Sequence, residues 1–149
     1  MAERQGIFQH ILAPTDGSGP SVAAGTLAIG LAALQHACIT FVYIVDTVVT
    51  DEIKDVSGKT VSQVQRELAR AGQRYLDHLA RLATEAQLET NQVLRHGTPH
   101  VEIVGLAGEQ DVDLIVIAHV GRRGLRRFPI GSVTERVIEY APCPVLVVK

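Results

Sequence analysis

Apolar and polar residues alternate along the chain in two patterns that predict strands and helices in regular succession. Short apolar runs rich in β-branched residues, or closed by turn residues, are typical of buried strands. Positions with apolar residues three and four apart are typical of helices that pack on a sheet. The predicted strands are residues 7–14, 38–45, 90–94, 114–118 and 145–148. The predicted helices are residues 20–35, 59–87, 99–108 and 132–140.

Capping residues support three of the helix starts. Ser18 or Gly19 precedes Pro20, and Thr98 precedes Pro99, so each helix has a polar cap followed by a proline in its first turn. Ser132 to Glu135 matches the capping-box pattern and predicts the start of the last helix. Residues 46–58 mix acidic, Thr and Ser residues without helical period, so we expect a surface segment that could cover a ligand.

This order of elements predicts a doubly wound α/β fold. Alternating strands and helices give a parallel sheet with right-handed crossovers and helices on both faces. Ligands of such sheets bind at the carboxyl ends of the strands, where the strand order reverses. The loops after the first and fourth strands are the richest in polar and glycine residues, so the predicted sheet order is 3-2-1-4-5. The chain has no linker or repeat, and we interpret residues 1–149 as a single domain.

Composition narrows the classes of function. The chain has 14 Lys and Arg against 16 Asp and Glu, a formal net charge of -2, which does not indicate a nucleic-acid-binding protein. Two cysteines without metal-ligand or disulfide-framework spacing favour a reducing compartment. The first residues lack a signal-peptide pattern, and no apolar run is long enough to span a membrane. We therefore expect a cytoplasmic protein.

The segment from Asp113 to Glu135 combines several features that favour anion binding. A buried strand is followed by a loop with Gly121, Gly124 and Gly131, which allow the backbone to approach a ligand closely. The same loop carries four arginines, at positions 122, 123, 126 and 127. It leads into a helix start, whose free N–H groups and partial positive charge favour phosphate. Ser132 and Glu135 could also act only as a helix cap, and the arginines only as a solvated surface.

These residues also carry a family resemblance. Gly121, nine intervening residues and then Gly131-Ser132 resemble the nucleotide-binding motif of the universal stress protein family. That motif has an additional glycine three residues before the second one, where this chain has Ala118. Pro14 to Ser18 and the terminal segment 141–148 extend the resemblance over the whole chain. The resemblance implies ATP or a similar adenine nucleotide as cofactor, and it leaves open whether Mg²⁺ accompanies the nucleotide.

The resemblance also implies roles for individual residues. Asp16, with Pro14 and Thr15, would lie near the ribose or a bound metal. Ile44 would meet the adenine through its backbone, and Ile117 and Ala118 would line the base and sugar. The phosphates would be held by Gly121, Gly131, Ser132 and Val133, and we add Arg122 from the arginine loop.

Other nucleotide motifs match less well. Gly17 to Val22 follows a strand and opens a helix like a dinucleotide fingerprint, and Asp46 ends the next strand, but Val22 stands where a third glycine belongs. The sequence around His119 resembles the HxGH motif of nucleotidylyl transferases but lacks its final histidine. No Walker A pattern is present.

The sequence therefore predicts a stress-response regulatory protein that binds an adenine nucleotide and is not an enzyme. Two alternatives stay open: a ligand-free interaction module, because of Ala118, and a slow ATPase. The apolar last strand, Val145–Val148, lies at a sheet edge in the predicted order, and with the family resemblance it predicts a homodimer. An unidentified protein partner is also expected.

Overall fold

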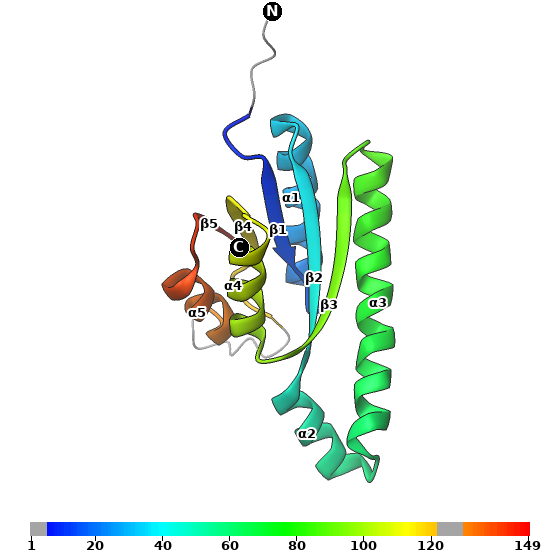
Figure 1. Ribbon diagram of the computed structural model, residues 1–149. Helices are drawn as coiled ribbons and strands as arrows, with labels where there is room; N and C mark the ends of the chain where they lie inside the picture. The colour runs from blue at the N-terminus through cyan, green and yellow to red at the C-terminus, as the bar shows by residue number, and fades with distance from the viewer. Residues whose placement is uncertain (1–5, 122–129) are drawn as a thin grey trace, which may run out of the picture.

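The computed structural model describes residues 6–121 and 130–149, in which a five-stranded sheet is covered by helices (Figure 1). The strands are β1 (His10–Pro14), β2 (Cys38–Asp46), β3 (Thr90–Gly97), β4 (Leu114–Ala118) and β5 (Val145–Val148). The helices of the described residues are α1 (Gly19–Gln35), α2 (Thr47–Ser57), α3 (Val61–Glu85), α4 (Pro99–Glu109) and α5 (Ser132–Tyr140).

The sheet has the predicted topology. All its strands pair in parallel, and their order is β3-β2-β1-β4-β5, so β1 lies in the centre with β2 and β4 on either side. The strand order therefore reverses between β1 and β4, as predicted, and the carboxyl ends of these two strands lie next to each other.

Each face of the sheet has its own core, because successive side chains of a strand point to opposite faces. Ile11 and Phe41 pack with α1 and α3, whereas Leu12 and Val42 pack with α4 and α5. Figure 1 shows these two helix pairs on opposite sides of the sheet. The prediction of helices on both faces is confirmed.

Two predicted strands differ from the observed ones by three residues at one end, and the second strand by one residue, Asp46. The first begins at His10 rather than at residue 7, because the backbone N–H groups of Gln9 and His10 donate to the Asp113 carboxylate at 2.8 and 3.0 Å. The third runs on to Gly97, since every residue from Thr90 onward pairs with β2.

The prediction that residues 46–58 form no helix is wrong, although most of these residues are exposed, as expected of a surface segment. Thr47–Ser57 form α2, which follows β2 directly at the carboxyl end of the sheet (Figure 1). The Asp46 side chain accepts from the Val48 N–H at 2.9 Å, and Gly58 ends the helix with φ of 71°. Capping at both ends thus stabilises a helix that has only one buried residue, Thr50.

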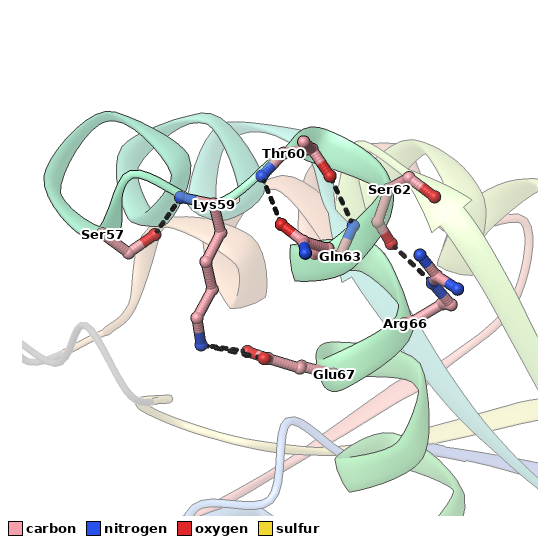
Figure 2. A network of polar contacts seen from close by, with 7 residues as sticks. All are labelled: Ser57, Lys59, Thr60, Ser62, Gln63, Arg66 and Glu67. Carbon is pink, nitrogen blue, oxygen red and sulfur yellow. Dashed lines mark hydrogen bonds and ion pairs between the residues drawn. The ribbon is translucent and has the colours of Figure 1, made fainter.

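The junction between α2 and α3 is held by short polar contacts (Figure 2). Thr60 and Gln63 form a reciprocal capping box at the start of α3, with bonds of 3.2 and 2.9 Å. Lys59 Nζ lies 2.8 Å from a Glu67 carboxylate oxygen, and the Lys59 N–H donates to Ser57 Oγ at 3.3 Å. These contacts fix where the chain turns from α2 into the long helix.

Glycines allow α3 to pack closely beside the carboxyl ends of the central strands. A Cβ at Gly72 would collide with the ring of Tyr43, and a Cβ at Gly17 would collide with the ring of Tyr75. Gly17 also has a φ of 81°, which side-chain-bearing residues rarely adopt. The two tyrosine rings lie 6.2 Å apart between α3 and the strand ends.

Candidate functional site

A cavity of about 290 Å³ opens at the carboxyl ends of the central strands. Every predicted ligand-binding residue that the structure describes lines this cavity. They are Pro14, Thr15, Asp16, Ile44, Ile117, Ala118, Gly121, Gly131, Ser132 and Val133. The remaining one, Arg122, lies outside the described residues, as do the other three arginines of the loop.

The turn after β1 is held by its own hydrogen bonds. Thr15 is buried, its N–H donates to the Val42 carbonyl at 2.9 Å, and its hydroxyl lies 3.0 Å from the Ser21 hydroxyl. Asp16 Oδ1 accepts from the Ser18 N–H at 2.9 Å. The Asp16 side chain is therefore positioned at the cavity wall by the backbone of the turn.

The glycine that follows β4 lies against this carboxylate. A Cβ at Gly121 would collide with Asp16 Oδ2, so any other residue at this position would require the Asp16 carboxylate to move. The loops after β1 and β4 thus meet at the point where the strand order reverses, which is where ligands of such sheets bind.

The floor of the cavity is formed by the last residues of β4. Ile117 and Ala118 are 6% and 4% exposed. The hydroxyl of Thr134, in the first turn of α5, donates to the Ala118 carbonyl at 2.7 Å. This buried bond fixes the start of α5 to the end of β4.

Helix α5 begins at the cavity wall with glycine as its N-cap. The Gly131 N–H donates to the His119 carbonyl at 2.6 Å, and a Cβ at Gly131 would lie 3.4 Å from both that oxygen and Val120 Cα. The predicted capping box is wrong: Ser132 is the first helical residue, and no side chain of the described residues caps α5. The N–H groups of its first turn lack partners within the helix and face the site with a partial positive charge.

Several lining residues were not predicted. Asp46, Val49 and Glu52 come from the end of β2 and from α2, Leu68 from α3, and Pro99 and Ile103 from α4. Of these six residues, only Asp46 could have been identified from the sequence, because it is an acidic residue that ends a predicted strand. The others depend on α2 and on packing between elements far apart in the chain.

The cavity wall is uneven in charge and polarity. The charged side chains among its described lining residues are Asp16, Asp46 and Glu52, all acidic, while α5 contributes the positive end of a helix dipole. Within the described part of the chain, no group of three or more His, Cys, Asp or Glu side chains could hold a metal ion. A metal role for Asp16 therefore stays a prediction.

None of the helices in the described ranges is long and apolar enough to cross a membrane.

Both cysteines are free thiols, and burial raises the pKa of each thiol above its ordinary value. The negative charge of Glu89 raises the pKa of Cys38 further, and that of Asp113 raises the pKa of Cys143 further. Neither cysteine lines the cavity.

Known proteins resemble the chain in both sequence and structure. Universal stress protein MJ0531 of Methanocaldococcus jannaschii is 36% identical over 146 residues, which cover 97% of this chain and 84% of that protein. The structure of universal stress protein UspA from Lactobacillus plantarum matches with a TM-score of 0.83 and 26% identity, covering 95% of this chain and 98% of that one.

Two further solved structures share the fold and contain nucleotides. A universal stress protein in complex with cAMP matches with a TM-score of 0.72 and 24% identity, covering 95% and 97% of the two chains. The universal stress protein from Archaeoglobus fulgidus in complex with dAMP matches with a TM-score of 0.70 and 23% identity, covering 96% and 99%.

The family model of the universal stress protein family matches residues 7–149. Together with the sequence identity to the archaeal relative, this match shows that the chain belongs to the universal stress protein family.

Proposed function

We propose that this protein binds ATP or a similar adenine nucleotide in the cavity and acts as a nucleotide-regulated protein of the stress response. The observation that carries the proposal is the meeting, at the reversal of strand order, of two glycine-containing loops and a helix start that no side chain of residues 6–121 or 130–149 caps. The N–H groups of such a helix start are available to bind an anion when no side chain caps them. The cAMP and dAMP complexes of proteins with this fold support a nucleotide as the anion.

The described residues fit such a ligand. Gly131 leaves room for close approach to the backbone, so the N–H groups of Ser132 and Val133 would hold phosphate oxygens together with the turn at Gly121. Ile117 and Ala118 would contact the sugar and base along the floor. Pro14, Thr15 and Asp16 would flank the ribose, with Ile44 at the base.

A divalent cation would add positive charge between Asp16 and the phosphates. Mg²⁺ is commonly bound by one or two carboxylates together with phosphate oxygens and water, so one aspartate suffices as a protein ligand. Binding of ATP that strengthens when Mg²⁺ is added to the wild-type protein, and strengthens less in Asp16→Asn, would support this role.

We propose binding rather than catalysis. The described lining residues include no His, Cys or Lys, and the carboxylates of Asp16 and Asp46 each accept a backbone N–H group of their own turn. We also propose that the protein is cytoplasmic and that it interacts with an unidentified protein partner. The free cysteines are consistent with a reducing compartment.

Thermal unfolding of the purified protein with and without ATP and Mg²⁺, followed by isothermal titration, tests the proposal. A saturable rise in the unfolding midpoint with 1:1 binding supports it. Multiple turnover of ATP would instead indicate an ATPase. No shift and no heat up to millimolar ATP would contradict nucleotide binding and favour a ligand-free interaction module.

We also propose that the protein forms a homodimer through β5. This strand is the last in the sheet order, and Leu146 is 39% exposed although it lies in an apolar strand. Exposed apolar edges are normally covered, and a second copy of the strand is a suitable cover. Leu146→Glu should therefore give a monomer in size-exclusion chromatography with light scattering, whereas an unchanged dimer would exclude β5 as the interface.

A further inference from the structure

Asp46 is held in one orientation by the first turn of α2. Its Oδ1 atom accepts from the Val48 N–H at 2.9 Å, and its carbonyl accepts from the Thr50 hydroxyl at 2.9 Å. Thr50 is only 2% exposed, so the second bond is protected from water. Asp46 also lines the cavity. No hydrogen bond to its second oxygen, Oδ2, is found among the described residues.

The sheet order places Asp46 away from the proposed phosphate site. Asp46 ends β2, whereas Gly131 lies beyond β4, and β1 runs between these two strands. Strand spacing then separates the two ends of the cavity by about 10 Å across the sheet. That separation is comparable with the distance from the phosphate of a nucleotide to its base.

Charge at the two ends favours one orientation of an anionic ligand. The end formed by β2 and α2 carries the carboxylates of Asp46 and Glu52, and the end formed by α5 carries the positive end of a helix dipole. Phosphates are repelled at the first end and attracted at the second. The uncharged base and sugar must then face α2, where a carboxylate oxygen is an acceptor for their N–H and O–H groups.

We propose that Asp46 determines the ligand specificity of this cavity, by accepting a hydrogen bond on Oδ2 from an N–H or O–H group in the base–sugar half of the nucleotide. The inference rests on the proposed function and adds to it the residue that distinguishes one nucleotide from another. A donor aimed at a fixed carboxylate is strongly preferred, because its absence leaves the charge without a partner.

Asp46→Asn tests this role without removing the helix cap. Asparagine caps helices as well as aspartate does, so its Oδ1 keeps the bond from the Val48 N–H while an NH₂ group replaces Oδ2. Asp46→Ser is the second variant, since serine also caps helices and lacks the second oxygen altogether. Asp51→Asn is the control: it makes the same charge change on α2, at an exposed residue that does not line the cavity.

Isothermal titration would compare ATP with ITP, 2′-deoxy-ATP and 3′-deoxy-ATP. ITP has a carbonyl group in place of the adenine amino group, and the deoxy analogues each lack one sugar hydroxyl. We expect the wild-type protein to bind one of these about 10- to 100-fold more weakly than ATP. Both Asp46 variants should bind ATP more weakly by a similar factor, and they should no longer discriminate against that analogue. The group that the analogue lacks is then the donor to Asp46. Asp51→Asn should bind like the wild type.

Two results would overturn the inference, and they are distinguishable. Affinities and ATP-to-analogue ratios within about twofold of wild type in both Asp46 variants would exclude Asp46 and leave nucleotide binding intact. Absence of binding to any nucleotide by the wild-type protein would remove the proposed function as well.

Discussion

Gly131→Ala separates the requirements of the fold from those of the ligand. Gly131 has φ of −68° and ψ of 155°, which alanine adopts without strain. The added Cβ would lie 3.4 Å from His119 O and Val120 Cα, an ordinary van der Waals contact. Glycine is the somewhat better N-cap, whereas alanine loses less entropy on folding, so we expect the free energy of unfolding to change by about 1 kcal/mol or less.

The same methyl group stands where phosphate should approach the start of α5. With ATP at about 100 times its dissociation constant, binding stabilises the wild-type protein by about 2.7 kcal/mol and raises the midpoint by roughly 5 to 11 °C. If the methyl group weakens binding about a hundredfold, the same ATP concentration stabilises the variant by only about 0.4 kcal/mol, or roughly 1 to 2 °C.

The assay is thermal unfolding with and without ATP and Mg²⁺, and Gly105→Ala is the matched control. Gly105 lies on α4 with open space around the added Cβ, so this variant should raise the ligand-free midpoint and keep the full ATP shift. An ATP shift in Gly131→Ala equal to that of the wild type would show that the ligand does not approach Gly131, and the assignment of the phosphate site would be wrong.

Three further measurements test the surroundings of the site. Thr134→Val should lower the free energy of unfolding, measured by urea denaturation, by about 1 to 3 kcal/mol, because the buried Ala118 carbonyl loses its hydrogen bond. An unchanged free energy of unfolding would show that this hydrogen bond does not stabilise the protein. Gly17→Ala should destabilise the protein more strongly, because it combines a positive φ with a collision against the Tyr75 ring. An unfolding midpoint within about 2 °C of the wild type, which corresponds to about 0.5 to 1 kcal/mol, would argue against this strain. Burial and Asp113 raise the pKa of the Cys143 thiol, so iodoacetamide should alkylate it more slowly at neutral pH than it alkylates an unfolded peptide, as followed by mass spectrometry.

The strands could be predicted because the relevant information is local, and their order could be predicted because the loops after the first and fourth strands carry the polar and glycine residues typical of a site where strand order reverses. Buried parallel strands are continuous apolar runs, and residues 114–118 contain no polar side chain. The polar end of β3, Arg95 to Gly97, gave no such signal, since an edge strand is only partly buried. Its length is set by pairing with β2, which the sequence of β3 alone does not show.

Helix α2 could not be predicted from hydrophobic periodicity. Val48 and Val56 are 53% and 87% exposed, so its apolar residues do not form one buried stripe. The signals that it does have are at its ends, Asp46 as N-cap and Gly58 in the left-handed conformation. The lining residues that α2 contributes, Val49 and Glu52, were missed for the same reason.

The two capping patterns of the chain show why a local rule can succeed in one place and fail in another. Thr60 and Gln63 form a complete capping box on the exposed start of α3, where interactions within the helix alone determine which residue is the N-cap. At α5 the pattern from Ser132 to Glu135 fits equally well, yet the bond from the Gly131 N–H to the His119 carbonyl places glycine at the N-cap. A glycine cannot cap a helix with a side chain, and among the residues that the structure describes no other side chain caps α5, so the N–H groups at its start are available to solvent or to a ligand. The local rule is broken at the wall of the cavity, which is where a binding site would require it to be broken.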